Sequence, residues 1–148
     1  MNNDLVEYVR NKKTIIAIII RNSFSKDGIE FFTPQEFSQQ LGYMKRPKGY
    51  IIKPHIHCQI PREISTTQEV LFIKKGKIRV DFYDDNKKYI VSVILLKGDF
   101  IMLISDGHGF FMLEESEIIE VKQGPYLEET DKEKFEPISD DNIVIIRK

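Results

Sequence analysis

The chain has 148 residues, and its 22 Lys and Arg against 23 Asp and Glu give a formal net charge of −1. This balance excludes a global electrostatic attraction to nucleic acid or to an anionic membrane, and the length is that of one ordinary domain. The single cysteine, Cys58, excludes an internal disulfide framework and is typical of a reducing compartment. The most apolar run, residues 14–20, is far shorter than the roughly 20 residues of a membrane-spanning helix. We therefore expect a soluble cytoplasmic protein.

One short helix is predicted in residues 33–42. Thr33 suits the N-cap, Pro34 suits the first helical position, and Glu36 completes a capping box. A second small helix is an option for residues 1–12.

Short β-type runs dominate the rest of the chain. They are rich in Ile, Val, Phe and Tyr and are separated by turn residues, which is typical of strands joined by tight connections. The predicted strands are 14–21, 28–33, 49–57, 68–75, 77–84, 89–96, 99–104, 109–115, 117–123 and 142–148. This succession predicts an all-β protein, built as an antiparallel sandwich or barrel.

Two of the three histidines, His55 and His57, lie one residue apart in the predicted strand 49–57. Residues i and i+2 of a strand point to the same face, so the two imidazoles are expected side by side. Glu69 opens the next predicted strand, and His108 lies at the start of a later one. Imidazole and carboxylate groups together suit a divalent cation such as Zn, Mn, Fe or Ni. The pattern predicts a metal site, with an ordinary core or surface role for each histidine as the alternative.

The same stretch resembles the first motif of the cupin superfamily. Gly49, five residues, His55-x-His57, a later glutamate, six residues and Gly76 follow that motif in order. The family's second motif begins with a glycine and ends with a histidine.

Gly98 and His108 resemble the two ends of this second motif. Two departures stand out: eleven residues separate His57 from Glu69, where the family usually has three or four, and Ile104 replaces the usual proline.

This resemblance implies a double-stranded β-helix, or jelly-roll, barrel. It implies one cupin domain over residues 1–148, with a barrel core of about 45–125, an N-terminal strand extension in 1–44 and a C-terminal strap in 126–148. The implied metal ligands are His55, His57, Glu69 and His108. The runs EVKQGPY (120–126) and DKEKF (131–135) also resemble small bacterial cupins that accompany surface-polysaccharide or nucleotide-sugar pathways.

Four further residues are candidates for binding or chemistry. Arg62 lies in the segment before Glu69 and suits contact with a carboxylate or phosphate of a substrate. Glu120 and Lys122 alternate on one strand and share a face, so they predict a general acid/base pair if that face points inward. Tyr126, which follows a Gly-Pro turn, suits a hydrogen bond to a ligand, or closure of the core.

The predicted function is that of a small-molecule metalloprotein: an isomerase, epimerase or lyase acting on a sugar or nucleotide sugar in surface-polysaccharide biosynthesis. An iron-dependent dioxygenase and a non-catalytic small-molecule-binding cupin are the alternatives, since a fold does not fix a function. Exposed edge strands and the apolar run 14–20 also predict a homodimer.

Overall fold

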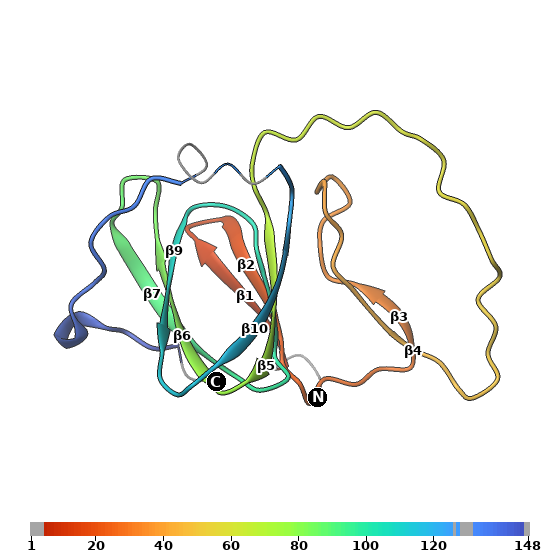
Figure 1. Cartoon of the computed structure of the whole chain (residues 1–148), viewed down its shortest axis with the longest axis horizontal. Coiled ribbons are helices and arrows are strands. Elements are labelled where there is room, and N and C mark those ends of the chain that lie inside the picture. The colour runs from red at the N-terminus through yellow and green to blue at the C-terminus, as the bar shows by residue number, and fades with distance from the viewer. Residues whose placement is uncertain (1–4, 126, 128–131, 147–148) are drawn as a thin grey trace. The chain divides into compact units, whose positions relative to one another are not determined.

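A computed structural model describes residues 5–125, 127 and 132–146 of the chain (Figure 1). The chain divides into two compact units. The first, here called the main unit, runs up to Phe24 and resumes at Thr67; the second, the insert unit, is Ser25–Thr66. This division does not test the prediction of a single domain over 1–148 with a barrel core at about 45–125, which stays a prediction.

The main unit consists of two antiparallel sheets. The first has the order β1-β2-β8-β5-β10, and the second has the order β7-β6-β9. The strands of the first sheet are β1 (Val6–Asn11), β2 (Thr14–Ile20), β5 (Glu69–Lys75), β8 (Phe100–Leu103) and β10 (Glu117–Lys122). Those of the second are β6 (Lys77–Tyr83), β7 (Tyr89–Leu96) and β9 (Gly107–Met112).

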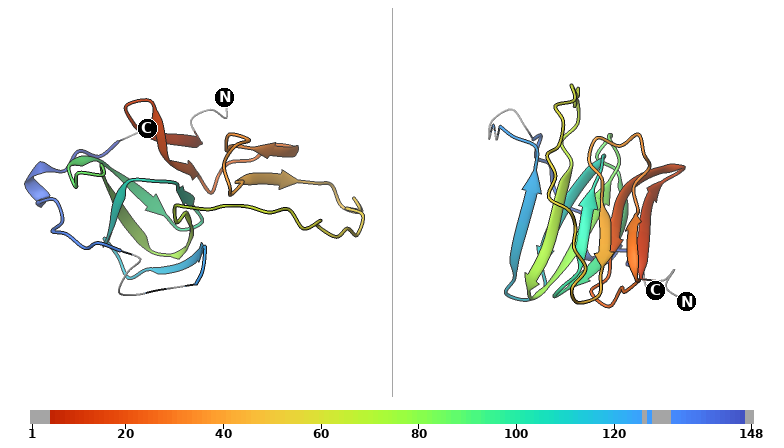
Figure 2. Two further views of the ribbon diagram at one scale, coloured as in Figure 1. Left: turned by 90° about the horizontal axis from the view of Figure 1, so that it is seen from above. Right: turned by 90° about the vertical axis from the view of Figure 1, so that its right-hand side faces the viewer.

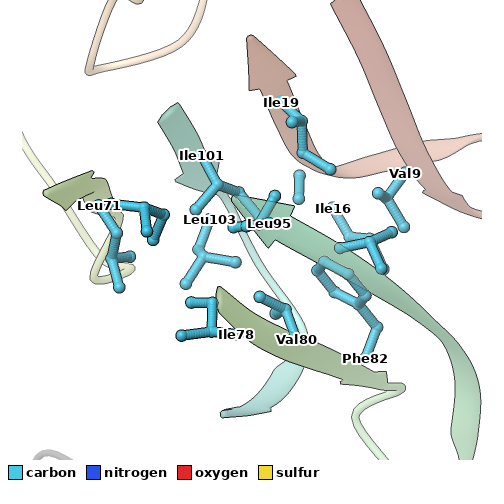
Figure 3. Packing of buried hydrophobic residues seen from close by; sticks show 13 residues of the cluster. Val9, Ile16, Ile19, Leu71, Ile78, Val80, Phe82, Leu95, Ile101 and Leu103 are labelled. Carbon is cyan, nitrogen blue, oxygen red and sulfur yellow. The ribbon is translucent and has the colours of Figure 1, made fainter. Parts of the chain in front are cut away.

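One apolar core joins the two sheets (Figure 3). It takes Ile16 and Ile19 from β2, Ile101 from β8, Val80 from β6 and Leu95 from β7, all of them fully buried. Strand β6 alternates in sequence, with Ile78, Val80 and Phe82 on the core side, whereas β2 is apolar throughout and is buried from Ile16 to Ile20. The prediction of an all-β protein is confirmed: among the described residues there is no α-helix, only the 3₁₀ turn Asp140–Asn142.

The apolar run 14–20 forms β2, as predicted. Its residues from Ile16 to Ile20 are buried, and β2 is hydrogen-bonded to β1 on one side and to β8 on the other. The apolar character of this run is thus used in the core of the main unit, and the homodimer stays a prediction.

Two glycines of the predicted motifs occupy positions that only glycine fits well. Gly76, between β5 and β6, has φ +85°, and Gly98, before β8, has φ +90°. A Cβ atom at Gly98 would lie 2.4 Å from the side chain of Asn22, so a larger residue would need both an unfavourable φ and a displaced neighbour.

A C-terminal strap, residues 132–146, runs along the second sheet: Phe135 packs on Tyr83, Asp140 pairs with Arg79, and its last residues bond to β7. Ser92 of β7 donates its N–H to the Val144 carbonyl at 2.8 Å, and Ile146 donates back to the Ser92 carbonyl at 2.9 Å. Beneath the strap, Arg79 and Asp81 of β6 form a buried ion pair with an Nε–Oδ1 distance of 2.8 Å. The predicted strand 142–148 is thus reduced, over its described residues, to a single parallel bridge between Ser92 and Ile145.

The insert unit contains one strand pair and a long irregular segment. Strands β3 (Gly28–Phe31) and β4 (Gly42–Lys45) form an antiparallel pair. Residues 46–66, here called the arm, contain no strand and run as an extended trace in Figures 1 and 2. The predicted strand 49–57 is therefore wrong. Within the described residues, the one backbone-to-backbone hydrogen bond of the arm is from Tyr50 N to the Pro47 carbonyl, so the arm lacks the neighbouring strand that a ladder requires.

The helix predicted in 33–42 is also wrong. Only one turn forms, with the Phe37 N–H bonded to the Pro34 carbonyl at 3.2 Å. The side-chain amide of Gln40 donates to the carbonyls of Pro34 and Phe37, both at 2.9 Å, and so occupies acceptors that a continuing helix would use. Residues 6–11 form β1, which removes the helix considered for 1–12.

A buried ion cluster ties the first two strands to the turn before β8. Asp99 accepts from the Arg21 guanidinium at 2.8 Å and from the backbone N–H groups of Asn22 (2.9 Å) and Leu96 (3.0 Å). Arg21 also donates to Glu7 of β1 at 2.7 Å.

Replacing Asp99 by Ala is expected to destabilise the protein by about 3 kcal/mol or more, because it leaves a partly buried guanidinium and two N–H groups without their acceptor. The matched control Asp27→Ala removes a surface partner of Lys45 and is expected to cost less than about 1 kcal/mol. Urea unfolding of both variants measures the difference. Equal effects would show that the Asp99 cluster does not hold these elements together.

Candidate functional site

The core-facing side of the main unit changes from apolar to polar at one end of β5, β9 and β10. His108 lies opposite Phe82 in the β6–β9 register, and Glu120 lies opposite Leu71 in the β5–β10 register. Residues directly opposite each other in an antiparallel pair share a face, and both Phe82 and Leu71 belong to the core. The predicted pair Glu120 and Lys122 therefore lies on the core-facing side. An acid/base role was predicted for this pair if its face points inward.

Five side chains meet at this end and are here called the polar cluster: Glu69, His108, Glu120, Lys122 and Lys132. Glu69 is at the centre, with only 5% of its side chain exposed. Its Oε2 lies 3.1 Å from His108 Nε2, and its Oε1 lies 3.4 Å from Lys122 Nζ and 3.7 Å from Lys132 Nζ. Lys122 Nζ also lies 2.9 Å from Glu120 Oε1.

The contacts of Glu69 keep its carboxyl ionised. The hydrogen bond from His108 is the largest cause, and with the nearby positive charges it lowers the pKa of Glu69 to about 2, although burial alone would raise it. An ionised carboxylate only accepts hydrogen bonds, so His108 Nε2 is the donor. In a neutral imidazole this leaves Nδ1 as the nitrogen that can accept a proton.

The ammonium of Lys122 is held in its charged form. Its hydrogen bond to Glu120 is the largest cause of a raised pKa, and the charges of Glu120 and Glu69 act in the same direction. With 16% of its side chain exposed, against 25% for His108, it remains reachable from solvent. The cluster thus offers a proton acceptor and a fixed positive charge next to each other.

The other predicted ligands lie in the arm of the insert unit. The rings of His55 and His57 are adjacent, with centroids 5.1 Å apart, even though the segment is not a strand. His55 Nδ1 lies 2.9 Å from the Lys53 carbonyl, so it is the donor nitrogen, and Nε2 has a free lone pair. Arg62 is exposed and its guanidinium reaches only the Ile60 carbonyl, at 3.4 Å.

The predicted metal ligands differ in how well they fit a cation. Two imidazoles on one tetrahedral ion, with metal–nitrogen distances of about 2.0–2.1 Å, have ring centres roughly 5 Å apart, which the His55–His57 pair matches. Glu69 fits less well, because two ammonium groups already surround it. Over the residues that the structure describes, no three His, Cys, Asp or Glu side chains gather as a metal site. The four-ligand site stays a prediction.

One member of the polar cluster, Lys132, was not among the site residues predicted from the sequence. Lys132 belongs to the DKEKF run that carried the family resemblance, but the run gave no indication that its first lysine contacts Glu69. The predicted Tyr126 lies outside the described residues.

Comparison with known proteins adds no further identification. No family model, no curated protein and no solved structure matches the chain. In the described ranges, no helix has the length and apolar character needed to cross a membrane.

The depressed pKa of Glu69 makes its contribution to stability dependent on pH. Because the folded pKa is lowered from the usual 4.5 to about 2, the contribution is complete above pH 4.5 and disappears as the pH falls through about 2. The Glu69→Gln variant should therefore be less stable than the natural chain at pH 7, by on the order of 3 kcal/mol, and the gap should close between pH 4.5 and 2.

Urea unfolding at several pH values measures this gap. The exposed control Glu136→Gln should follow the natural chain throughout. A gap that stays constant down to pH 2 would contradict an ionised, hydrogen-bonded Glu69.

Proposed function

We propose that this chain is a small-molecule enzyme of the cupin type that isomerises or epimerises a sugar or nucleotide sugar by moving a proton next to a carbonyl group. The observation that carries the proposal is the contact between His108 and Glu69 beside the ammonium of Lys122. This is a proton acceptor, a group that orients it and a positive charge, on the core-facing side of a two-sheet protein.

The proposed reaction uses these groups in turn. His108 Nδ1 takes a proton from the carbon next to the carbonyl, and the electron pair of that C–H bond moves to form an enolate. The ammonium of Lys122 stabilises the negative charge on the enolate oxygen. For the isomer, the proton of the adjacent hydroxyl moves to the enolate oxygen and His108 returns its proton to the former carbonyl carbon, so that the carbonyl ends on the neighbouring carbon. For the epimer, solvent water protonates the original carbon from the opposite face, and His108 releases its proton to solvent. Glu69 holds the imidazole in the required tautomer, and Glu120 positions Lys122.

The cupin part of the proposal is supported by the positions of the motif residues. Glu69 begins β5 and His108 lies on β9, and the two side chains are in contact although 38 residues separate them in the sequence. The motif glycines Gly76 and Gly98 have the positive φ that tight turns require. Arg62 and Tyr126 remain proposed contacts for an anionic or hydroxylated substrate.

Metal binding is a second form of the proposal, in which His55 and His57 hold a divalent ion with Glu69 and His108 as the further ligands that the resemblance implies. When bound, such an ion would act as a Lewis acid on a carbonyl or hydroxyl oxygen. The proton transfer described above needs only the groups of the polar cluster.

Proton transfer is tested by incubating the protein with 4-keto nucleotide sugars in D2O and following the protons next to the carbonyl by NMR. Lys122→Met and His108→Asn should each lower the exchange rate by roughly 10²–10⁴-fold, the usual contribution of a positioned acid or base. Lys74→Met is the matched control, since Lys74 only pairs with Glu117 on the surface. Binding without any exchange by the natural chain would instead make the protein a non-catalytic binder.

Metal binding is tested separately by loading the protein with Zn, Mn, Fe or Ni, desalting it and measuring the metal that stays bound. We expect the natural chain and the control Arg62→Ala to retain a stoichiometric ion, and the His55→Ala/His57→Ala variant to lose it. Equal retention by all three would show that the histidine pair is not the site.

A further inference from the structure

The arm of the insert unit has the features of a strand without a neighbour. After a turn at residues 47–50, it continues to residue 66 without a strand, and a connection of this length without secondary structure is unusual inside a compact domain. Its large apolar side chains are exposed rather than packed: Ile51 is 77% exposed and Ile56 94%. Apart from the carbonyls of Pro47, Lys53 and Ile60 and the Tyr50 N–H, which have local partners, the backbone groups of the arm are available for pairing with another chain, and so are its isoleucines.

The main unit presents a matching edge. Among the strands that the structure describes, β9 has one hydrogen-bonded neighbour, β6, and its other edge is open. Its apolar side chains and the residue that follows it are unusually exposed, with Phe111 at 48%, Met112 at 47% and Leu113 at 41%. An open edge with exposed apolar residues is a template for an additional strand.

We infer that residues 51–57 of one copy of this chain, which follow the turn at 47–50, pair as an additional strand with β9 of a second copy. The insert unit is compact on its own, as expected of an element that protomers exchange. Pro54 is compatible with this role, since a proline is tolerated in an edge strand where its nitrogen faces away from the neighbour.

Charge favours an antiparallel direction. The start of the arm is basic, with Arg46 and Lys48, whereas Glu114 follows β9. The neighbouring Lys45 and Glu115 are already paired, with Asp27 and Lys75. An antiparallel strand places the basic end beside Glu114; a parallel strand places it at the opposite end of β9.

Strand alternation then fixes which faces meet. If His55 and His57 share the core-facing side with His108, Ile56 lies on the outer side with Gly109 and Phe111. Opposite residues of an antiparallel pair are about 4.5–5.5 Å apart at Cα, which a disulfide can bridge. The exchange would also bring the histidine pair of one copy to the polar cluster of the other. This last point alone rests on the proposed function.

The test uses two single-cysteine chains in a Cys58→Ser background, one with Ile56→Cys and the other with Gly109→Cys. A Cβ at Gly109 finds only an ordinary contact, 3.8 Å from Tyr83, so this variant is expected to fold. After co-expression and mild oxidation, we expect a covalent heterodimer as the main product on a non-reducing gel. Each chain oxidised alone is the control for random cross-linking.

Phe111→Cys in place of Gly109→Cys tests the register shifted by two residues. A chain carrying both cysteines that forms an internal disulfide and stays monomeric would overturn the inference, because the arm would then pair within its own chain. Absence of any cross-link with both partner positions would overturn it as well. The readout needs neither substrate nor metal, so its failure is distinct from failure of the proposed function.

Discussion

The site depends on one buried negative charge and on what surrounds it. Glu69 occupies the end of a core strand where an isolated carboxylate would be strongly disfavoured, and His108, Lys122 and Lys132 compensate that charge. Each partner comes from a different part of the chain: β9, β10 and the strap. The charge therefore fixes the protonation states around it and ties together three segments that share no local sequence signal.

The sequence was most informative for the strands from β5 to β10. They lie close to their predicted ranges because they are rich in Ile, Val, Phe and Tyr and because turn residues, including Gly76 and Gly98, separate them. The contact between Glu69 and His108 was also within reach, since both belong to the motif resemblance. The charged partners could not be predicted. Nothing in the local sequence distinguishes Lys132 from other surface lysines, and the buried Arg21–Asp99 pair joins positions that are distant in the sequence.

The failures of sequence reasoning share a cause. Residues 49–57 have strand composition, but a strand forms only with a neighbour, and the arm has none within its unit. Thr33 and Pro34 do begin a turn, but the Gln40 side chain takes the carbonyls that a helix would use. In both segments the local sequence preference was outweighed by contacts that are not local. Residues 49–57 have no strand to pair with, and the turn at Pro34 loses its carbonyl acceptors to Gln40.

The split of the main unit around the insert has a kinetic consequence. Strand β2 pairs with β8, with Ala17 opposite Leu103, so the first sheet cannot close until most of the chain is present. Pairings of such long sequence separation pay a large loop-closure entropy before they gain contacts, and they slow folding. During synthesis on the ribosome, β2 can pair with β1 at once, but its isoleucines emerge long before β8 and the other core strands do. This apolar strand must then remain exposed, or be shielded by chaperones, until translation has passed β8.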